Sequence, residues 1–332
     1  MVRKKIREDQ FFSAISDEAV QPKTYVAPNY AVTLKPPLKE LTIGPVKIFP
    51  IGNWMKITRG TRFELQHMGK TFFLEFPPLA WEVSLLSSSK HAREEGLWYV
   101  NIAISLLRMA LIRRAKPKRL FPGPGNVESH PTELPPPYNI EYVLNKNKNL
   151  TPVGGAILRR YEIDAHDVTY FKRIKLSRIA NDIFNASAGS VGERIKNGLG
   201  WMTLARQTKA RAERYIHYFT ALEALLTSND QTVPITQTIA RSVCCILGAR
   251  NKDRISLAET VKKLYHKRSA LVHAGKRSSI HLSDVDSIQI LTESAYQEVV
   301  FKVSLRTSND AFLKGLDQAT YGLKWPPVSM QH

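Results

Sequence analysis

The spacing of apolar residues changes about half-way along the chain, and this change constrains the fold more than any other feature. From about residue 171 onward, apolar side chains recur three and four positions apart, which places them on one face of an α-helix. The pattern predicts helices over the ranges 172–186, 191–209, 211–228, 235–248, 254–273 and 284–306. Short connections between helices favour antiparallel neighbours in a bundle. Residues 171–332 are therefore predicted to form an all-α helical domain.

Signals at the helix ends support these ranges. Gly248 and Gly275 each follow a predicted helix, where glycine is favoured because it accepts a left-handed backbone. Ser283 and Asp286 lie three positions apart at the start of the last long helix and predict a capping box. The pair Asp284 and Asp286 is also compatible with a metal site, but helix capping explains it better.

Residues 1–170 have a mixed, strand-rich pattern. Alternating apolar residues from Thr61 to Phe76, with Gly69 between them, predict a β-hairpin. One helix is expected near 97–114, and the prolines in 115–137 exclude a helix or a central strand there. Weaker strand candidates are Trp81–Leu86, Tyr138–Leu144 and Ala156–Ile163. The predicted class is α+β: a strand-rich N-terminal domain of unknown fold (1–170), followed by the helical domain (171–332).

The chain is strongly basic. Its 48 Lys and Arg against 29 Asp and Glu give a net charge of +19. Counted from the sequence, residues 1–170 hold 24 basic and 16 acidic residues, hence +8, and the remainder holds 24 and 13, hence +11. A charge of this size favours a polyanionic partner, such as nucleic acid or an anionic membrane surface. Because both halves share the excess, it is not a detachable basic tail.

Several features argue against a membrane protein or a metalloprotein. The first residues lack the apolar core of a signal peptide, and the most apolar stretch, Leu97–Ile112, contains Asn101 and Arg108. It is too short and too polar for a membrane span, so a buried helix is expected. Adjacent Cys244 and Cys245 fit a reducing, cytoplasmic compartment. No Cys/His zinc spacing is present, and no cofactor or metal is predicted.

Two charges occupy apolar stripes of the predicted helices. Arg268 lies four positions from both Leu264 and Val272, and Glu223 lies four positions from Phe219. A buried charge is costly unless it is paired or used. A structural ion pair between Glu223 and Arg268 is one explanation, and it does not exclude a functional role. His273 ends the helix that carries Arg268, where the helix dipole favours a cationic side chain.

The segment Arg268-Ser-Ala-Leu-Val-His273 resembles the Arg-x4–6-His motif of HEPN domains. It lies where that family places the motif, at the end of a helix late in an α-helical bundle. The upstream helix, with Ala221-Leu222-Glu223, is similar to the "ALE" helix of ApeA-like HEPN proteins. The resemblance covers residues 190–306. Other Arg/His pairs at this spacing lack the surrounding helix pattern, namely Arg62/His67, Arg159 or Arg160 with His166, and Arg211/His217.

The resemblance implies a metal-independent endoribonuclease that acts as a dimer. His273 would transfer a proton to or from the reacting oxygens, since an imidazole titrates near neutral pH. Arg268 would bind the phosphate and stabilise the charge of the transition state. A second His273 and Arg268 would come from the other protomer. The expected products are a 2′,3′-cyclic phosphate and a 5′-hydroxyl end.

Further residues receive supporting roles from the same comparison. Glu223, Ser269 and Tyr265 would support the catalytic pair; Tyr265 is expected to be core, with base stacking as the less favoured alternative. Candidate RNA-binding residues flank the motif: Lys262, Lys263, Lys267, Lys276 and Arg277.

The implied biology is that of an RNase toxin or antiphage effector acting by abortive infection. Its predicted partners are RNA, a second copy bound through the helical domain, and a regulatory partner or antitoxin. The alternative is a non-catalytic HEPN module that binds RNA or a protein. A less favoured alternative is a partner of a nucleotidyltransferase.

Overall fold

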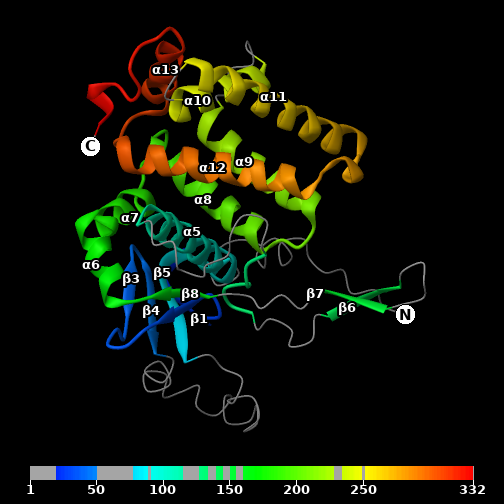
Figure 1. Cartoon of the computed structure of the whole chain (residues 1–332). Coiled ribbons are helices and arrows are strands. Elements are labelled where there is room, and N and C mark those ends of the chain that lie inside the picture. Colours follow the sequence, from blue (N-terminus) through cyan, green and yellow to red (C-terminus); the bar gives the residue numbers. More distant parts are fainter. Residues whose placement is uncertain are drawn as a thin grey trace, which may run out of the picture.

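The protein consists of a strand-rich N-terminal part and a helical C-terminal part (Figure 1). The α+β class predicted from the sequence is thereby confirmed. This computed structural model describes residues 20–50, 78–88, 91–114, 127–133, 140–144, 150–154, 160–227, 234–248 and 251–331.

A four-stranded antiparallel sheet forms most of the N-terminal part. In spatial order its strands are β1 (Gln21–Pro28), β5 (Leu79–Ser87), β4 (Val46–Pro50) and β3 (Leu41–Ile43). Trp81 and Val83 point inward from β5 and are fully buried. The register places Trp81 opposite Ile48 on one side and Ala27 on the other. Strand β5 confirms the strand predicted at Trp81–Leu86, whereas the other three strands were not predicted.

Two short strand pairs lie outside this sheet. Strands β2 (Val32–Leu34) and β8 (Tyr161–Ile163) pair in parallel, and β6 (Ile140–Leu144) and β7 (Leu150–Gly154) pair antiparallel. Strands β6 and β8 confirm two predicted strands, although β8 is shorter than expected. The hairpin predicted from Thr61 to Phe76 lies outside the described residues. Within the predicted proline-rich loop, the described residues 127–133 form neither helix nor strand.

Helix α5 (Ala92–Arg113) connects the two parts of the fold. It packs against β5 on one side and against α8 (Val191–Gln207) on the other (Figure 1). Among the described residues it is the one helix long and apolar enough to cross a membrane by length and composition. However, 72% of that stretch is buried inside the fold, as predicted for a core helix.

The C-terminal part is a bundle of helices (Figure 1). Besides α8, the helices are α6 (Ala165–Arg173), α7 (Leu176–Phe184), α9 (Arg211–Leu226), α10 (Ile235–Leu247), α11 (Asn251–Ala274), α12 (Leu282–Lys302) and α13 (Asn309–Thr320). The predictions for α8 to α12 are confirmed. The helix predicted over 172–186 is wrong: the chain breaks it at Lys175, which has a left-handed backbone with φ of 54°. Helix α13 was not predicted.

The helix ends agree with the sequence signals in all but one case. Gly248 caps α10, and Gly275, with φ of +62°, ends α11. The capping box of α12 was placed two residues too late. Its N-cap is His281, whose backbone N–H donates to Asp284 Oδ2 at 2.8 Å. The Ser283–Asp286 prediction is therefore wrong because both residues already lie inside the helix.

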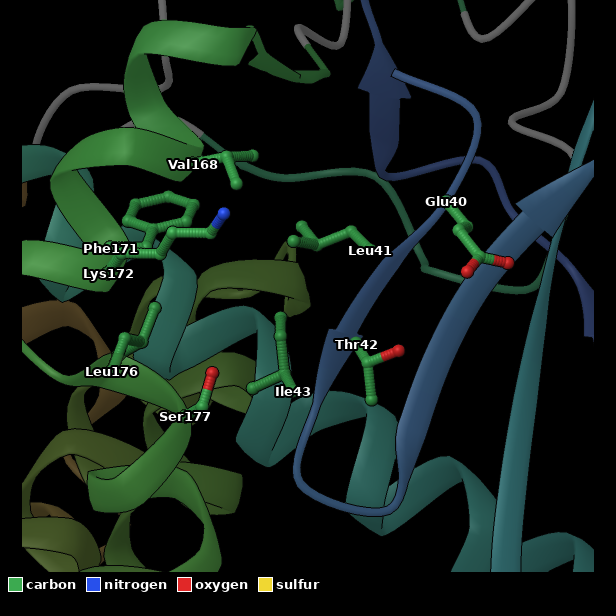
Figure 2. A pocket seen from close by; sticks show the side chains of 9 residues that line it. All are labelled: Glu40, Leu41, Thr42, Ile43, Val168, Phe171, Lys172, Leu176 and Ser177. Atoms are coloured by element: carbon green, nitrogen blue, oxygen red, sulfur yellow. The ribbon is translucent and has the colours of Figure 1, made fainter.

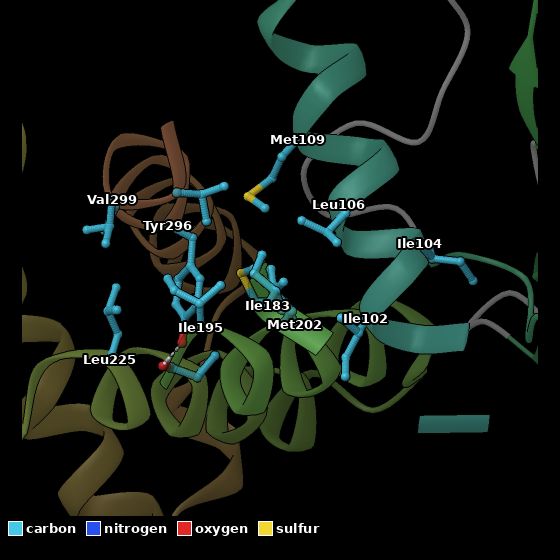
Figure 3. Close-up of a cluster of buried hydrophobic side chains, with 14 of the residues drawn as sticks. Ile102, Ile104, Leu106, Met109, Ile183, Ile195, Met202, Leu225, Tyr296 and Val299 are labelled. Atoms are coloured by element: carbon cyan, nitrogen blue, oxygen red, sulfur yellow. Dashed lines mark hydrogen bonds between the residues drawn. The ribbon is translucent and has the colours of Figure 1, made fainter. Parts of the chain in front are cut away.

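The two parts share one hydrophobic core. Figure 3 shows Leu106 and Met109 of α5 pointing toward Met202 of α8 and Tyr296 of α12. The same buried cluster continues into the sheet through Trp81. The strands end at Ile163 and helices follow from Ala165. The domain boundary near residue 170 remains a prediction, with continuous apolar packing on either side of it.

Candidate functional site

Helices α9 and α11 bring the predicted charged residues together. The Arg268 Nη2 atom donates to Glu223 Oε2 at 3.1 Å, and the two side chains are 22% and 21% exposed. The Tyr215 hydroxyl of α9 donates to the Leu264 carbonyl of α11 at 2.6 Å, which provides a second contact between the two helices. The ion pair suggested by the apolar stripes is therefore present. It lies at the edge of the core, where both side chains are partly exposed although Arg268 Nε is buried.

Tyr265 completes a small cluster with this ion pair. Its ring packs edge-on against Phe219, with centroids 5.6 Å apart, and the Arg268 guanidinium carbon lies 5.6 Å from its centroid. Tyr265 is half-buried and packs against the hydrophobic core, as its predicted core role requires. Burial raises the pKa of Glu223, and Arg268 opposes this effect. The arrangement holds Arg268 in one orientation through both charge and ring contact.

His273 lies apart from Arg268 within one chain. It is exposed in the last turn of α11, just before Gly275 reverses the backbone. Five positions along an α-helix turn the side chain by about 140°. Arg268 therefore faces α9, while His273 faces solvent. The structure does not join these two residues within one chain, so a shared site requires a second molecule or a bound substrate.

The exposed side of α11 carries a second imidazole that sequence reasoning missed. Lys262, His266 and His273 are exposed, and Ser269, at an intermediate position, is half-buried. Their spacing of three and four residues places them along one side of the helix. The signal was present in the sequence as a seven-residue interval between His266 and His273.

The five predicted RNA-binding cations divide into two groups. Lys267 contacts both oxygens of Asp284, at 2.8 and 2.6 Å, and so ties α11 to the first turn of α12. Arg277 pairs with Glu213 at 3.2 Å on the surface. By contrast, Lys262 and Lys263 on α11 are exposed, as is Lys276 beyond its end. These three are the cations best placed to meet a phosphate backbone.

A second charged cluster lies buried between the two parts of the fold, and the sequence did not predict it. Arg108 of α5 donates from Nε and Nη2 to the two oxygens of Glu293 on α12, at 2.9 and 3.2 Å. Glu128, from the segment 127–133, lies 3.2 Å from Arg108 Nη1 and 3.1 Å from Arg206 Nε. The Tyr161 hydroxyl of β8 donates to the same Glu128 oxygen.

Burial and charge act against each other in this cluster. Burial lowers the pKa of Arg108, but the facing carboxylates of Glu293 and Glu128 raise it well above its ordinary range. Burial likewise raises the pKa of Glu293, but Arg108 and Arg206 outweigh it and hold that pKa below the usual value. The buried groups are therefore charged partners. They fasten α5, α8, α12 and the segment 127–133 to one another.

The histidines of the other Arg/His pairs lie in different surroundings. His217 stacks near Trp201, with ring centroids 5.5 Å apart, and its Nδ1 lies 3.3 Å from Thr208 Oγ1. Burial lowers the pKa of His217. The pair Arg62/His67 lies outside the described residues. His166 is exposed in the first turn of α6, after β8.

Neither Arg268 nor His273 lines any of three cavities in the described part of the chain. One of about 230 Å³ lies between β3 and helices α6 and α7, with Lys172 at its edge and Leu41 and Phe171 in its wall (Figure 2). One of about 590 Å³ lies between α10, α12 and the C-terminal segment. The third, of about 450 Å³, lies beside the end of α7. Because His273 is exposed, a substrate site there would be open to solvent in a single chain.

No protein-family model matches the sequence, and no curated protein and no solved structure is significantly similar to it. Function therefore has to be inferred from the residues and their geometry.

Proposed function

We propose that the protein is a metal-independent endoribonuclease of the HEPN type, whose site forms between two copies of the chain. The observation that carries this proposal is the arrangement at the end of α11. An exposed His273 follows an Arg268 whose guanidinium is oriented by Glu223 and whose side chain is 22% exposed. The net charge of +19 supports a polyanionic substrate.

The chemistry uses the nucleophile that RNA itself carries. One His273 imidazole takes the proton of the 2′-hydroxyl, and the resulting oxygen attacks the adjacent phosphorus. The bond from phosphorus to the 5′-oxygen breaks, and the His273 of the second protomer gives that oxygen a proton. Arg268 hydrogen-bonds the phosphate and stabilises its added negative charge. The products are a 2′,3′-cyclic phosphate and a 5′-hydroxyl end.

A dimer could bring together an Arg268 and a His273 that point in different directions within one chain. Arg268 and His273 diverge by about 140° around α11, so a second copy that packs its α11 against the first can supply the complementary groups to one cleft. Lys262, Lys263 and Lys276 would then flank that cleft. They would neutralise RNA phosphates and give binding a strong dependence on salt.

In this proposal the protein is a cytoplasmic toxin or antiphage effector, held in check by a regulatory partner or antitoxin. Two adjacent, buried free thiols, Cys244 and Cys245, fit a reducing compartment. The strand-rich part would sense the trigger or position the RNA.

The test is RNA cleavage in the presence of EDTA. His273→Ala is expected to lower the rate by about 100-fold or more, and Arg268→Ala by about 100- to 1000-fold. Exposed His166→Ala and Arg241→Ala serve as matched controls and should cleave at the wild-type rate. The cut ends should accept phosphate from polynucleotide kinase directly, because they carry a 5′-hydroxyl. Unchanged cleavage by His273→Ala refutes the catalytic assignment.

Solution mass tests the composite site. A dimer, alone or with RNA bound, is expected by sedimentation. A strict monomer that still cleaves RNA would contradict a site built from two chains.

One observation favours a second function, a non-catalytic module that binds RNA or a protein. The contacts of Arg268 with Glu223 and Tyr265 also suffice as a purely structural link between α9 and α11. RNA binding without cleavage by the wild-type protein, together with a lower melting temperature of Arg268→Ala, would select this alternative.

A further inference from the structure

The cavity of about 590 Å³ has a mixed, cationic lining that the proposed nuclease site does not use. It lies between the end of α10, the C-terminal half of α12 and residues 322–325, which follow α13 (Figure 1). Its size falls within the range of small-molecule binding sites. Its lining combines the buried Cys245 and Ile246 with charged and polar side chains.

Three cations line the cavity. Arg254 lies in the first turn of α11, and its Nε donates to the Gly248 carbonyl at 3.1 Å. This contact fixes the side chain and leaves the terminal nitrogens as further donors. Lys302 lies near the end of α12 and pairs with Glu298, one turn earlier on the same helix. Lys324 is exposed on the C-terminal segment. With Glu298 as the one acidic lining residue, the cavity carries a net charge of +2.

The wall of the cavity also offers an aromatic ring and neutral polar groups. Trp325 is half-buried and held edge to face against Phe312, with centroids 5.5 Å apart. Ser294 and Gln297 of α12 also line the cavity, and the Gln297 amide donates to the Met109 carbonyl of α5 at 3.4 Å. A ring, hydroxyl and amide groups, and several cations match the base, the sugar and the phosphates of a nucleotide.

We propose that this cavity binds a free nucleoside phosphate. Arg254, Lys302 and Lys324 would hold the phosphates, and Trp325 would contact the base. The Glu298 carboxylate would accept hydrogen bonds from the ribose hydroxyls.

This site is distinct from the end of α11 that carries His273. Arg254 and His273 are 19 positions apart on one continuous helix, which corresponds to about 29 Å at a rise of 1.5 Å per residue. The inference therefore does not depend on the proposed nuclease activity. The two places lie at opposite ends of helix α11, so ligand binding at one end can be tested separately from chemistry at the other.

Calorimetric titration of the full chain tests the site, with ADP as the probe and adenosine and pyrophosphate as comparisons. ADP is expected to bind, and adenosine to bind at least about tenfold more weakly because it lacks the charged groups. The double variant Lys302→Gln/Lys324→Gln should weaken ADP binding about tenfold or more. The control Lys39→Gln/Lys314→Gln removes the same charge from exposed positions outside the cavity and should bind ADP as wild type does.

Three results would overturn the proposal. The first is no heat of ADP binding at concentrations up to about 1 mM. The second is equal weakening by the cavity variant and by the control, which would mean that general charge carries the binding. The third is pyrophosphate binding as tight as that of ADP, which would remove the nucleoside from the assignment. Melting curves show whether the variants remain folded. The Lys302–Glu298 pair is on the surface, so its loss costs little stability.

Discussion

Replacing Glu128 by glutamine tests the buried charged cluster most directly. The change keeps the shape of the side chain but removes one of the two described carboxylates that face Arg108 and Arg206. The Glu128 side chain is 4% exposed, and it lies within 3.2 Å of both guanidinium groups. Removing one partner of a buried ion pair costs about 3–5 kcal/mol, because the remaining charge stays in a poorly solvated site.

The expected change in melting temperature follows from the chain length. Unfolding entropy of about 2.1 cal/mol/K per residue gives about 0.7 kcal/mol/K for 332 residues. A loss of 3–5 kcal/mol therefore lowers the melting temperature by about 4–7 °C. Differential scanning calorimetry measures this shift.

Glu133 provides the matched control within the same segment. Its side chain is 64% exposed and lies 4.0 Å from His130, so Glu133→Gln should leave the melting temperature within about 1 °C of wild type. If Glu128→Gln shifts the temperature no more than Glu133→Gln does, the cluster does not fasten the two parts of the fold, and the reasoning fails.

Three further predictions concern acid stability, helix packing and thiol reactivity. The pKa of Glu293 is lower in the folded protein than in the unfolded chain, so its contribution to stability is present above about pH 4.3 and is lost as the pH falls through the folded value. In Glu293→Gln the melting temperature should therefore fall less steeply as the pH is lowered below about 4.3. Gly198→Ala would place a Cβ 1.5 Å from the Tyr296 hydroxyl and should cost about 1–3 kcal/mol in urea unfolding, whereas an unchanged midpoint would contradict this packing. Burial, together with Cys245, raises the pKa of Cys244 to about 11, so a thiol reagent at pH 8 should label it only after unfolding, and rapid labelling of the native protein would refute its burial.

The apolar periodicity predicted the long helices well because each of them buries one continuous stripe. The apolar periodicity did not predict the break between α6 and α7 at Lys175, because no glycine or proline marks that position. It also missed β1, an edge strand in which Ala27 is the one buried residue. A half-exposed edge strand lacks the alternation that sequence reasoning needs.

The candidate site was predictable only in part. Arg268 and Glu223 were found because a charge on an apolar stripe requires a partner, and the structure supplies that partner at 3.1 Å. The pairing of Lys267 with Asp284 was not predicted, because the two residues lie on different helices and only the packing of α11 beside α12 brings them together. The cavity lined by Arg254 was not predicted either, because its lining residues come from separate helices and the C-terminal segment.

The sequence by itself determined the α+β class, the core character of α5 and the charges that stand on apolar stripes. These are local properties, set by spacing along one helix or strand. The tertiary structure alone decided that Arg108, Glu128, Arg206 and Glu293 meet in one buried cluster. Four separate segments contribute to it, and a charge so far from water is stable only where their packing supplies its counter-charge.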